Sequence, residues 1–187
     1  MKKVLACCFG FMFLVCSVGV GFATEKAPQK VFDLAKTTLV AYGTDPVIVS
    51  AVKAENAKGK TLDQIKKKDA EWKKTPGITA YMKAIMQSEC GQYLRKIMDK
   101  SNLYSEIFVM DNQGANVAMT DKTSDYWQGD EAKFKNSFNG GSGNVFVDDV
   151  EFDDSSQKYL SQVSVPVKDG DTVIGAITFG IDVDQVE

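Results

Sequence analysis

The chain has 187 residues, which is enough for one domain with a substantial core. Its 22 basic residues are outnumbered by 25 acidic ones, so we expect no basic face for a nucleic-acid partner. The absence of histidine excludes Ser-His and Cys-His catalytic pairs and histidine-based zinc sites. Arg95 is the only arginine, and therefore the only candidate for a guanidinium fork around a ligand carboxylate.

The first residues resemble a secretory signal. Lys2 and Lys3 precede an uncharged run over residues 4–23, which ends in small residues before Thr24. We therefore predict a signal peptide over 1–23, cleavage after Ala23, and a periplasmic or extracellular location. Because the run is also long enough to span a membrane, an uncleaved anchor is the alternative.

Cysteine usage fits export without a disulfide. Three of the four cysteines lie within the predicted leader, and only Cys90 remains after cleavage. No internal disulfide can then form, and we expect the Cys90 thiol to be buried in a helix.

The first half of the mature chain has a helical period. Gly43 ends the first apolar stripe, Asp45 followed by Pro46 starts a second helix, and Thr61 with Gln64 forms a capping box for a third. A solvated helix face is predicted for Lys66, Lys67 and Lys68, because Asp63, Asp69 and Glu71 lie beside them. The predicted helices cover residues 26–42, 46–57, 62–75 and 78–100, the last kinked or divided at Gly91.

From residue 104 onward the period changes to that of strands. A hairpin is predicted over 107–120, a short helix near 130–138, and three further strands at 145–152, 159–167 and 173–183. Helices followed by five strands indicate an α+β domain with an antiparallel sheet. We predict one domain over 24–187, mainly helical over 24–103 and mainly sheet over 104–187.

The long connection after the hairpin contains Asp125, Tyr126, Trp127, Asp130 and a glycine between them. Long connections in compact domains are usually functional loops or disordered segments, and aromatic residues argue against disorder. We therefore interpret it as a candidate lid over a binding pocket. The alternative is that Tyr126 and Trp127 only seal one end of the core.

Several motifs together resemble the Cache family of extracellular PAS-like sensor domains. They are Phe-Val-Met-Asp-Asn-Gln-Gly at 108–114, the segment 125–131, Ser-Val-Pro-Val at 164–167, Gly-Ala-Ile at 175–177 and Gly-Ile-Asp at 180–182. The resemblance implies a five-stranded antiparallel sheet with a long N-terminal helix and additional helices on one face. It also implies a small-molecule pocket on the other face, under the 121–138 connection.

The resemblance also bears on signalling. Cache domains usually lie between transmembrane helices and pass a ligand signal to a cytoplasmic output domain. This sequence shows no second apolar span before Glu187. We therefore expect an exported sensor that signals through a separate membrane receptor or kinase.

The resemblance leaves two ligand classes open. Amino-acid-binding relatives carry an arginine near the lid aromatics and an aspartate on the last strand; here the lid has no arginine, whereas Asp182 matches the aspartate. One class is a cationic or amine-bearing ligand, held by acidic residues and stacked on an aromatic ring. The other is a neutral or acidic metabolite held by backbone amides. We favour the cation, and the predicted ligand-binding residues are Met110, Met119, Asp125, Tyr126, Trp127, Asp130, Phe146, Asp148, Gln162 and Asp182.

A metal site and a cofactor are not predicted. Five acidic residues crowd residues 148–154, as a calcium site would require. Strand alternation, however, directs Asp148 and Asp149 to opposite faces, so they should not share one site.

The predicted function is therefore a non-enzymatic sensor domain. A structural or interaction module of the cell envelope is the alternative. Glycosidic chemistry by a pair such as Asp125 and Asp130 is disfavoured because nothing in the sequence sets the separation of the two carboxylates. A homodimer through the N-terminal helix is a further possible partnership.

Overall fold

The structure is a computed structural model that describes residues 25–154 and 156–186. The predicted leader and its cleavage site lie outside the described residues. Within the described part of the chain, no helix is both long and apolar enough to span a bilayer.

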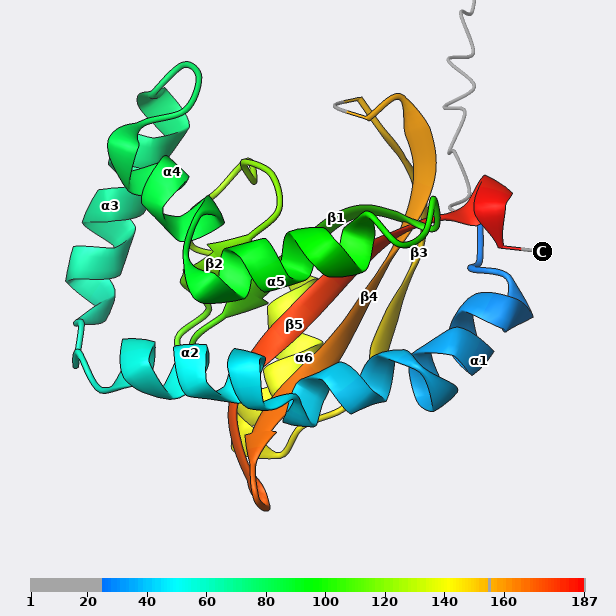
Figure 1. Cartoon of the computed structure of the whole chain (residues 1–187), viewed down its shortest axis with the longest axis horizontal. Helices are drawn as coiled ribbons and strands as arrows, with labels where there is room; N and C mark the ends of the chain where they lie inside the picture. Colours follow the sequence, from blue (N-terminus) through cyan, green and yellow to red (C-terminus); the bar gives the residue numbers. More distant parts are fainter. Residues whose placement is uncertain (1–24, 155, 187) are drawn as a thin grey trace, which may run out of the picture.

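Three helical segments follow one another along one side of the molecule (Figure 1). They are α1 (Gln29–Thr37), the 3₁₀ helix η1 (Leu39–Thr44) and α2 (Pro46–Asn56). The long N-terminal helix is thus built in pieces. At Gly43 a Cβ would lie 2.3 Å from the carbonyl oxygen of Pro166, so glycine permits the close approach to the sheet. Asp45 caps α2 by accepting from the Val47 amide at 2.9 Å, as predicted.

Three more helices complete the first half: α3 (Leu62–Lys74), α4 (Ala80–Met86) and α5 (Glu89–Met98). The predicted capping box of Thr61 and Gln64 is present at the start of α3. The predicted helix over 78–100 is two helices, and the break lies at Ser88 instead of Gly91. The Ser88 hydroxyl accepts from the Gly91 amide, and a Cβ on Gly91 would meet the Met86 carbonyl oxygen at 2.4 Å. Cys90 is a buried free thiol in α5, as predicted.

The second half forms one antiparallel sheet with the strand order β2-β1-β5-β4-β3. The predicted α+β class and five-stranded sheet are confirmed. The strands are β1 (Tyr104–Met110), β2 (Asn116–Met119), β3 (Phe146–Asp153), β4 (Lys158–Asp169) and β5 (Thr172–Asp182). A short helix, α6 (Ala132–Phe138), joins β2 to β3.

The two faces of the sheet carry separate apolar clusters. The first cluster packs Ile107, Val109 and Phe179 against α1, α2 and α5. The second cluster joins Phe108 and Met110 to α3, α4 and α6, and α6 lies behind β4 and β5 in Figure 1. Helices therefore cover both faces, but the second face is covered unevenly. The second cluster fills its β2 end and α6 packs against β3, β4 and β5, but two hollows remain beside them.

Candidate ligand-binding site

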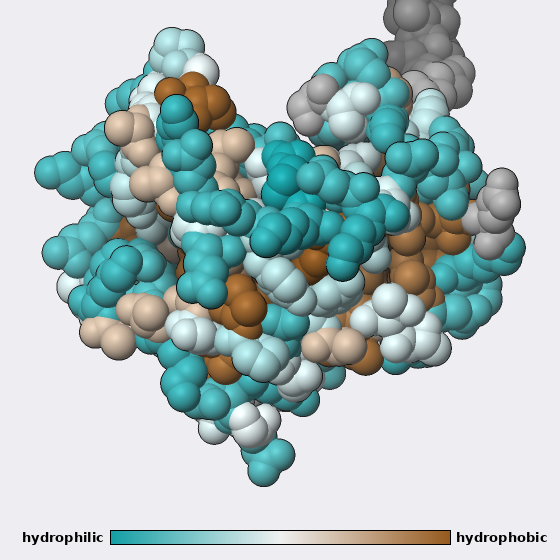
Figure 2. Space-filling view, in the orientation of Figure 1, coloured by the Kyte–Doolittle hydropathy of each residue, from teal (hydrophilic) through white to brown (hydrophobic). Residues whose placement is uncertain are grey.

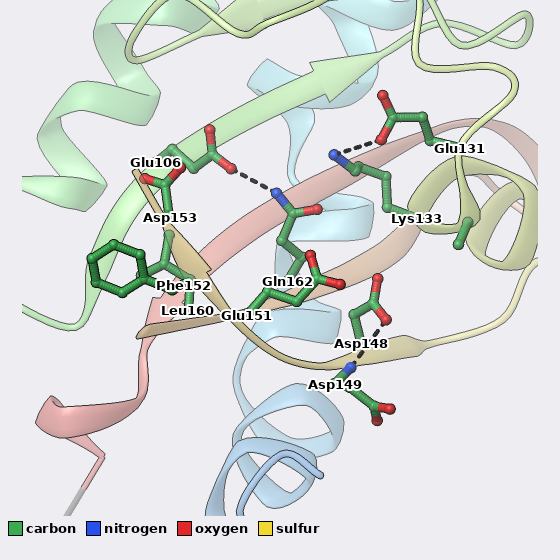
Figure 3. Close-up of a pocket in the computed structure, with 11 residues that line it drawn as sticks. Glu106, Glu131, Lys133, Asp148, Asp149, Glu151, Phe152, Asp153, Leu160 and Gln162 are labelled. Carbon is green, nitrogen blue, oxygen red and sulfur yellow. Dashed lines mark hydrogen bonds and ion pairs between the residues drawn. The ribbon is translucent and has the colours of Figure 1, made fainter. Parts of the chain in front are cut away.

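Two adjoining hollows lie on the second face of the sheet. The first, which we call the β3 hollow, has a volume of about 220 Å³ and is shown in Figure 3. The second, the connection hollow, has a volume of about 390 Å³. The β3 hollow is lined by Glu106, Glu131, Ala132, Lys133, Asp148, Asp149, Glu151, Phe152, Asp153, Leu160 and Gln162. The connection hollow is lined by Glu106, Phe108, Lys122, Thr123, Ser124, Gln128, Lys133, Asp153 and Gln162, so four residues belong to both walls.

The β3 hollow is strongly acidic. Among the described residues that line it, six carry a carboxylate and Lys133 is the only base. The Lys133 ammonium lies 3.0 Å from a Glu131 carboxylate oxygen and 5.6 Å from the centroid of the Phe108 ring, and its side chain is 13% exposed. Because this lysine already has an acidic partner, the wall retains an excess of negative charge.

Glu106 lies at the centre of the site, on the pocket side of β1. Its carboxylate accepts from Nε2 of Gln162 at 2.8 Å (Figure 3). Gly180 of the neighbouring strand β5 leaves room for this side chain, since a Cβ there would lie 2.7 Å from Cγ of Glu106. Burial raises the pKa of the Glu106 carboxyl above its ordinary value, and the charge of Lys133 and the bond from Gln162 only partly oppose that rise.

A β-bulge shapes the β3 side of the wall. The register of β3 against β4 shifts between Val147 and Val150, so Asp148 and Asp149 sit outside the regular pleat. Both residues contribute to the wall. Their carboxylates still diverge (Figure 3), and Asp149 forms an ion pair of 2.8 Å with Lys26. Across residues 25–154 and 156–186, no group of three or more acidic, cysteine or histidine residues is arranged to hold a metal ion.

Tyr126 of the connection is built into the end of the core. It is 1% exposed, and its hydroxyl bonds to Lys60 at 2.8 Å and to Tyr81 at 3.1 Å. The neighbouring indole of Trp127 donates to the Gln113 carbonyl at 2.8 Å, and the Lys66 ammonium lies 4.6 Å from its centroid. This placement corresponds to the alternative in which the aromatics seal the core.

The other predicted site residues are divided between the hollows and the rest of the molecule. Asp148 and Gln162 line the hollows. Met110 and Met119 are fully buried in the second cluster, Phe146 is half-buried on β3, and Asp130 is exposed. Asp125 forms an ion pair with Lys73 at 2.9 Å, and the buried Asp182 forms one with Lys158 at 2.8 Å.

Sequence reasoning missed Glu106, Lys133, Phe152 and Asp153. A signal for Glu106 was present, because it alternates with Phe108 and Met110 and so shares their face of β1. Lys133 is on a short helix whose orientation only the packing determines.

Comparisons with known proteins find similarity to solved structures only. No protein-family model matches the chain, and no curated protein matches it. The chain is similar to the sensor domain of the Vibrio cholerae histidine kinase DctB, with 13% identity, a TM-score of 0.44, and coverage of 84% of this chain and 55% of that one. These similar structures are sensor domains of histidine kinases and chemoreceptors.

Two chemoreceptor domains are also among the similar structures. The ligand-binding domain of Campylobacter jejuni Tlp3, in complex with 4-methylisoleucine, is 12% identical, with a TM-score of 0.43 and coverage of 84% of this chain and 60% of that one. The ligand-binding domain of Pseudomonas aeruginosa PctC, in complex with GABA, is 10% identical, with a TM-score of 0.38 and coverage of 85% and 64%. The chain thus spans less than two thirds of these structures. Likenesses at such identities and TM-scores transfer no ligand, site or partner to it.

Proposed function

We propose that this chain is an exported, non-enzymatic binding domain for a small molecule that carries a positively charged nitrogen. The observation that carries the proposal is the excess of carboxylates in the β3 hollow, six against one lysine. The cation lies in that hollow, and the bound state is read by a separate membrane receptor or kinase.

The electrostatics of the hollow favour a cation. Carboxylates that share a partly desolvated wall repel one another, and a bound ammonium group relieves that repulsion. Burial opposes the ionised form of Glu106, so a bound cation would stabilise that carboxylate. An anionic ligand would add to the repulsion, so the hollow discriminates by charge.

An aromatic ring borders the same wall. Phe152 lines the β3 hollow, and its ring centroid lies 5.1 Å from that of Tyr159 on β4. A cation over an exposed aromatic face gains about 0.5 to 1 kcal/mol. The stacking role that the sequence suggested for Tyr126 and Trp127 is therefore proposed for Phe152.

One observation favours the structural or interaction module as a second candidate. Tyr126 is nearly fully buried and bonded within the core, so the central aromatic of the supposed lid already has a structural role. A module of this kind would bind its envelope partner equally well with and without amines.

Calorimetric titration of the purified mature protein with butylamine and with butyrate tests the proposal. We expect butylamine to bind and butyrate not to bind. Glu106→Gln should weaken butylamine roughly 10- to 100-fold, the cost of losing a hydrogen bond to a charged group. Asp171→Asn, which removes an exposed carboxylate from the turn after β4, is the matched control and should leave the Kd unchanged. Binding of neither compound, or equal loss in both variants, would refute the proposal.

A further inference from the structure

The connection hollow differs from the β3 hollow in its charge. Its wall carries two acidic residues, Glu106 and Asp153, and two lysines, Lys122 and Lys133. The Lys122 ammonium is held in place by a bond of 2.8 Å to the Thr75 carbonyl oxygen. With charges balanced in this way, the connection hollow suits an uncharged polar group better than a second cation.

Gln128 in the same wall has a hydrogen-bond acceptor without a partner. Its side chain is 1% exposed, and Nε2 donates to the Asp125 carbonyl at 2.8 Å, which determines the orientation of the amide. Oε1 is left buried, with no hydrogen-bond partner among the described residues. Buried acceptors are nearly always paired in native proteins, so an unpaired one beside a hollow points to a donor supplied from outside the chain.

A second side-chain amide under the connection, that of Asn116, also donates hydrogen bonds while its oxygen accepts none. Asn116 donates from Nδ2 to the Asp125 carbonyl oxygen at 3.1 Å and to Thr123 at 2.7 Å, while its Oδ1 has no partner among the described residues. The side-chain amides of Asn116 and Gln128 thus both donate to the Asp125 carbonyl oxygen, and the oxygen of each amide has no donor. What this region lacks is therefore hydrogen-bond donors.

We infer that the connection hollow is a second subsite, which takes an uncharged O–H or N–H donor of the ligand whose ammonium group occupies the β3 hollow. The inference rests on the proposed function and narrows the ligand class to amino alcohols and amino amides. The two hollows share Glu106, Lys133, Asp153 and Gln162, so one small molecule reaches both. Because Oε1 of Gln128 is covered by the wall, its pairing requires a side-chain movement, as is common when binding sites fill.

The test compares three amines of equal length by calorimetric titration: an amino alcohol, the corresponding alkylamine and the corresponding diamine. The series runs from two to five carbons. At the best length we expect the mature wild-type protein to bind the amino alcohol roughly tenfold more tightly than the alkylamine, the worth of one hydrogen bond. It should also prefer the amino alcohol to the diamine.

Gln128→Met keeps the size of the side chain and removes Oε1, together with the Nε2 bond to the Asp125 carbonyl oxygen. We expect this variant to bind the alkylamine as the wild type does and to lose the preference for the amino alcohol. Thermal unfolding checks that the variant is folded. If it is not, Gln128→Glu serves instead, and its added charge should reverse the preference toward the diamine.

The outcomes separate the two proposals. Equal binding of alcohol and alkylamine at every length, a preference for the diamine, or an unchanged preference in Gln128→Met would overturn the second subsite. Sensitivity of alkylamine binding to Glu106→Gln would in those cases still support the proposed function. Failure of every amine to bind would overturn both.

Discussion

Asp69 shows how a single buried carboxylate positions a whole segment. Its Oδ1 accepts from the backbone amides of Tyr126 and Trp127, at 2.9 and 3.1 Å. Its other oxygen pairs with Lys73 at 2.9 Å, and the same ammonium pairs with Asp125. These two acidic partners, Asp69 first, raise the pKa of Lys73 above its ordinary value. The connection is thereby tied to α3.

Asp69→Ala should lower the free energy of unfolding by about 2 to 4 kcal/mol, because two buried amides lose their acceptor. Asp69→Asn retains one oxygen and should cost less. Urea denaturation followed by tryptophan fluorescence measures both. Asp63→Ala, an exposed acidic residue in the first turn of the same helix, is the control and should cost less than about 1 kcal/mol. Equal losses at positions 63 and 69 would contradict the anchoring role.

At the scale of elements, the connection between β2 and α6 is held at several points. Besides Asp69, the Gln128 amide donates to the Gly114 carbonyl at 2.8 Å, and Gly129 packs against the Trp127 indole. A Cβ at Gly129 would lie 2.3 Å from the indole Nε1 and 2.6 Å from the Gln113 carbonyl oxygen. The connection is therefore a packed wall of the candidate site, fixed by these contacts, and not a loosely held loop.

Gly129→Ala should displace the Trp127 indole, break its bond to Gln113 and lower the free energy of unfolding by about 1 to 3 kcal/mol.

Trp127→Ala should lower the free energy of unfolding by about 3 kcal/mol and change amine binding little, because the ring seals the core instead of lining the hollows. Chemical denaturation of the double variant Gly129→Ala/Trp127→Ala tests whether the cost of Gly129→Ala comes from its clash with the indole. Once the indole is gone, Gly129→Ala should cost clearly less than it does alone. Full additivity, or a large loss of amine binding in Trp127→Ala, would contradict this account.

For the whole molecule, the rod of helices formed by α1, η1 and α2 lies on the opposite face of the sheet from the acidic hollows. The rod side in Figure 2 is largely hydrophilic, with hydrophobic atoms in small separate patches. α1 buries Val31 and Ala35 against the sheet. The homodimer through the N-terminal helix stays a prediction, and light scattering on the mature protein measures it.

The acidic hollow should also make global stability depend on pH. The pKa of Glu106 is raised in the folded state, so its protonated form stabilises the fold and that contribution is lost as pH rises through the raised pKa. Glu106→Gln should therefore raise the melting temperature at neutral pH and have little effect in acid. Amine binding has the opposite dependence, because it needs the ionised carboxylate. It should weaken as pH falls through the raised pKa, earlier than an ordinary glutamate would allow.

Thermal melts and amine titrations across the acid range measure these dependences. Asp171→Asn, which carries no such burial, should leave both pH profiles unchanged. A lower melting temperature for Glu106→Gln at neutral pH would contradict the argument.

The secondary structure was largely predictable because its signals are local. The cap at Asp45, the capping box of Thr61 and Gln64, and the strand period of the segments that form β4 and β5 each extend over a few residues, and these elements appear as predicted. Even the division of the helix after residue 86 was anticipated, although a serine cap and not a glycine determines its place. The anchoring role of Asp69 was not predicted, because its own helix is polar around it and only the distant connection buries it.

By itself the sequence determined the α+β class, the five strands and the buried Cys90, since composition and period are properties of the chain alone. Only the tertiary structure decided which acids meet. The order β2-β1-β5-β4-β3 brings Glu106 next to Gln162, and a bulge that breaks the period of two places Asp148 and Asp149 in one wall. Register and bulges depend on pairing between distant segments, and such pairing has no signal within either segment.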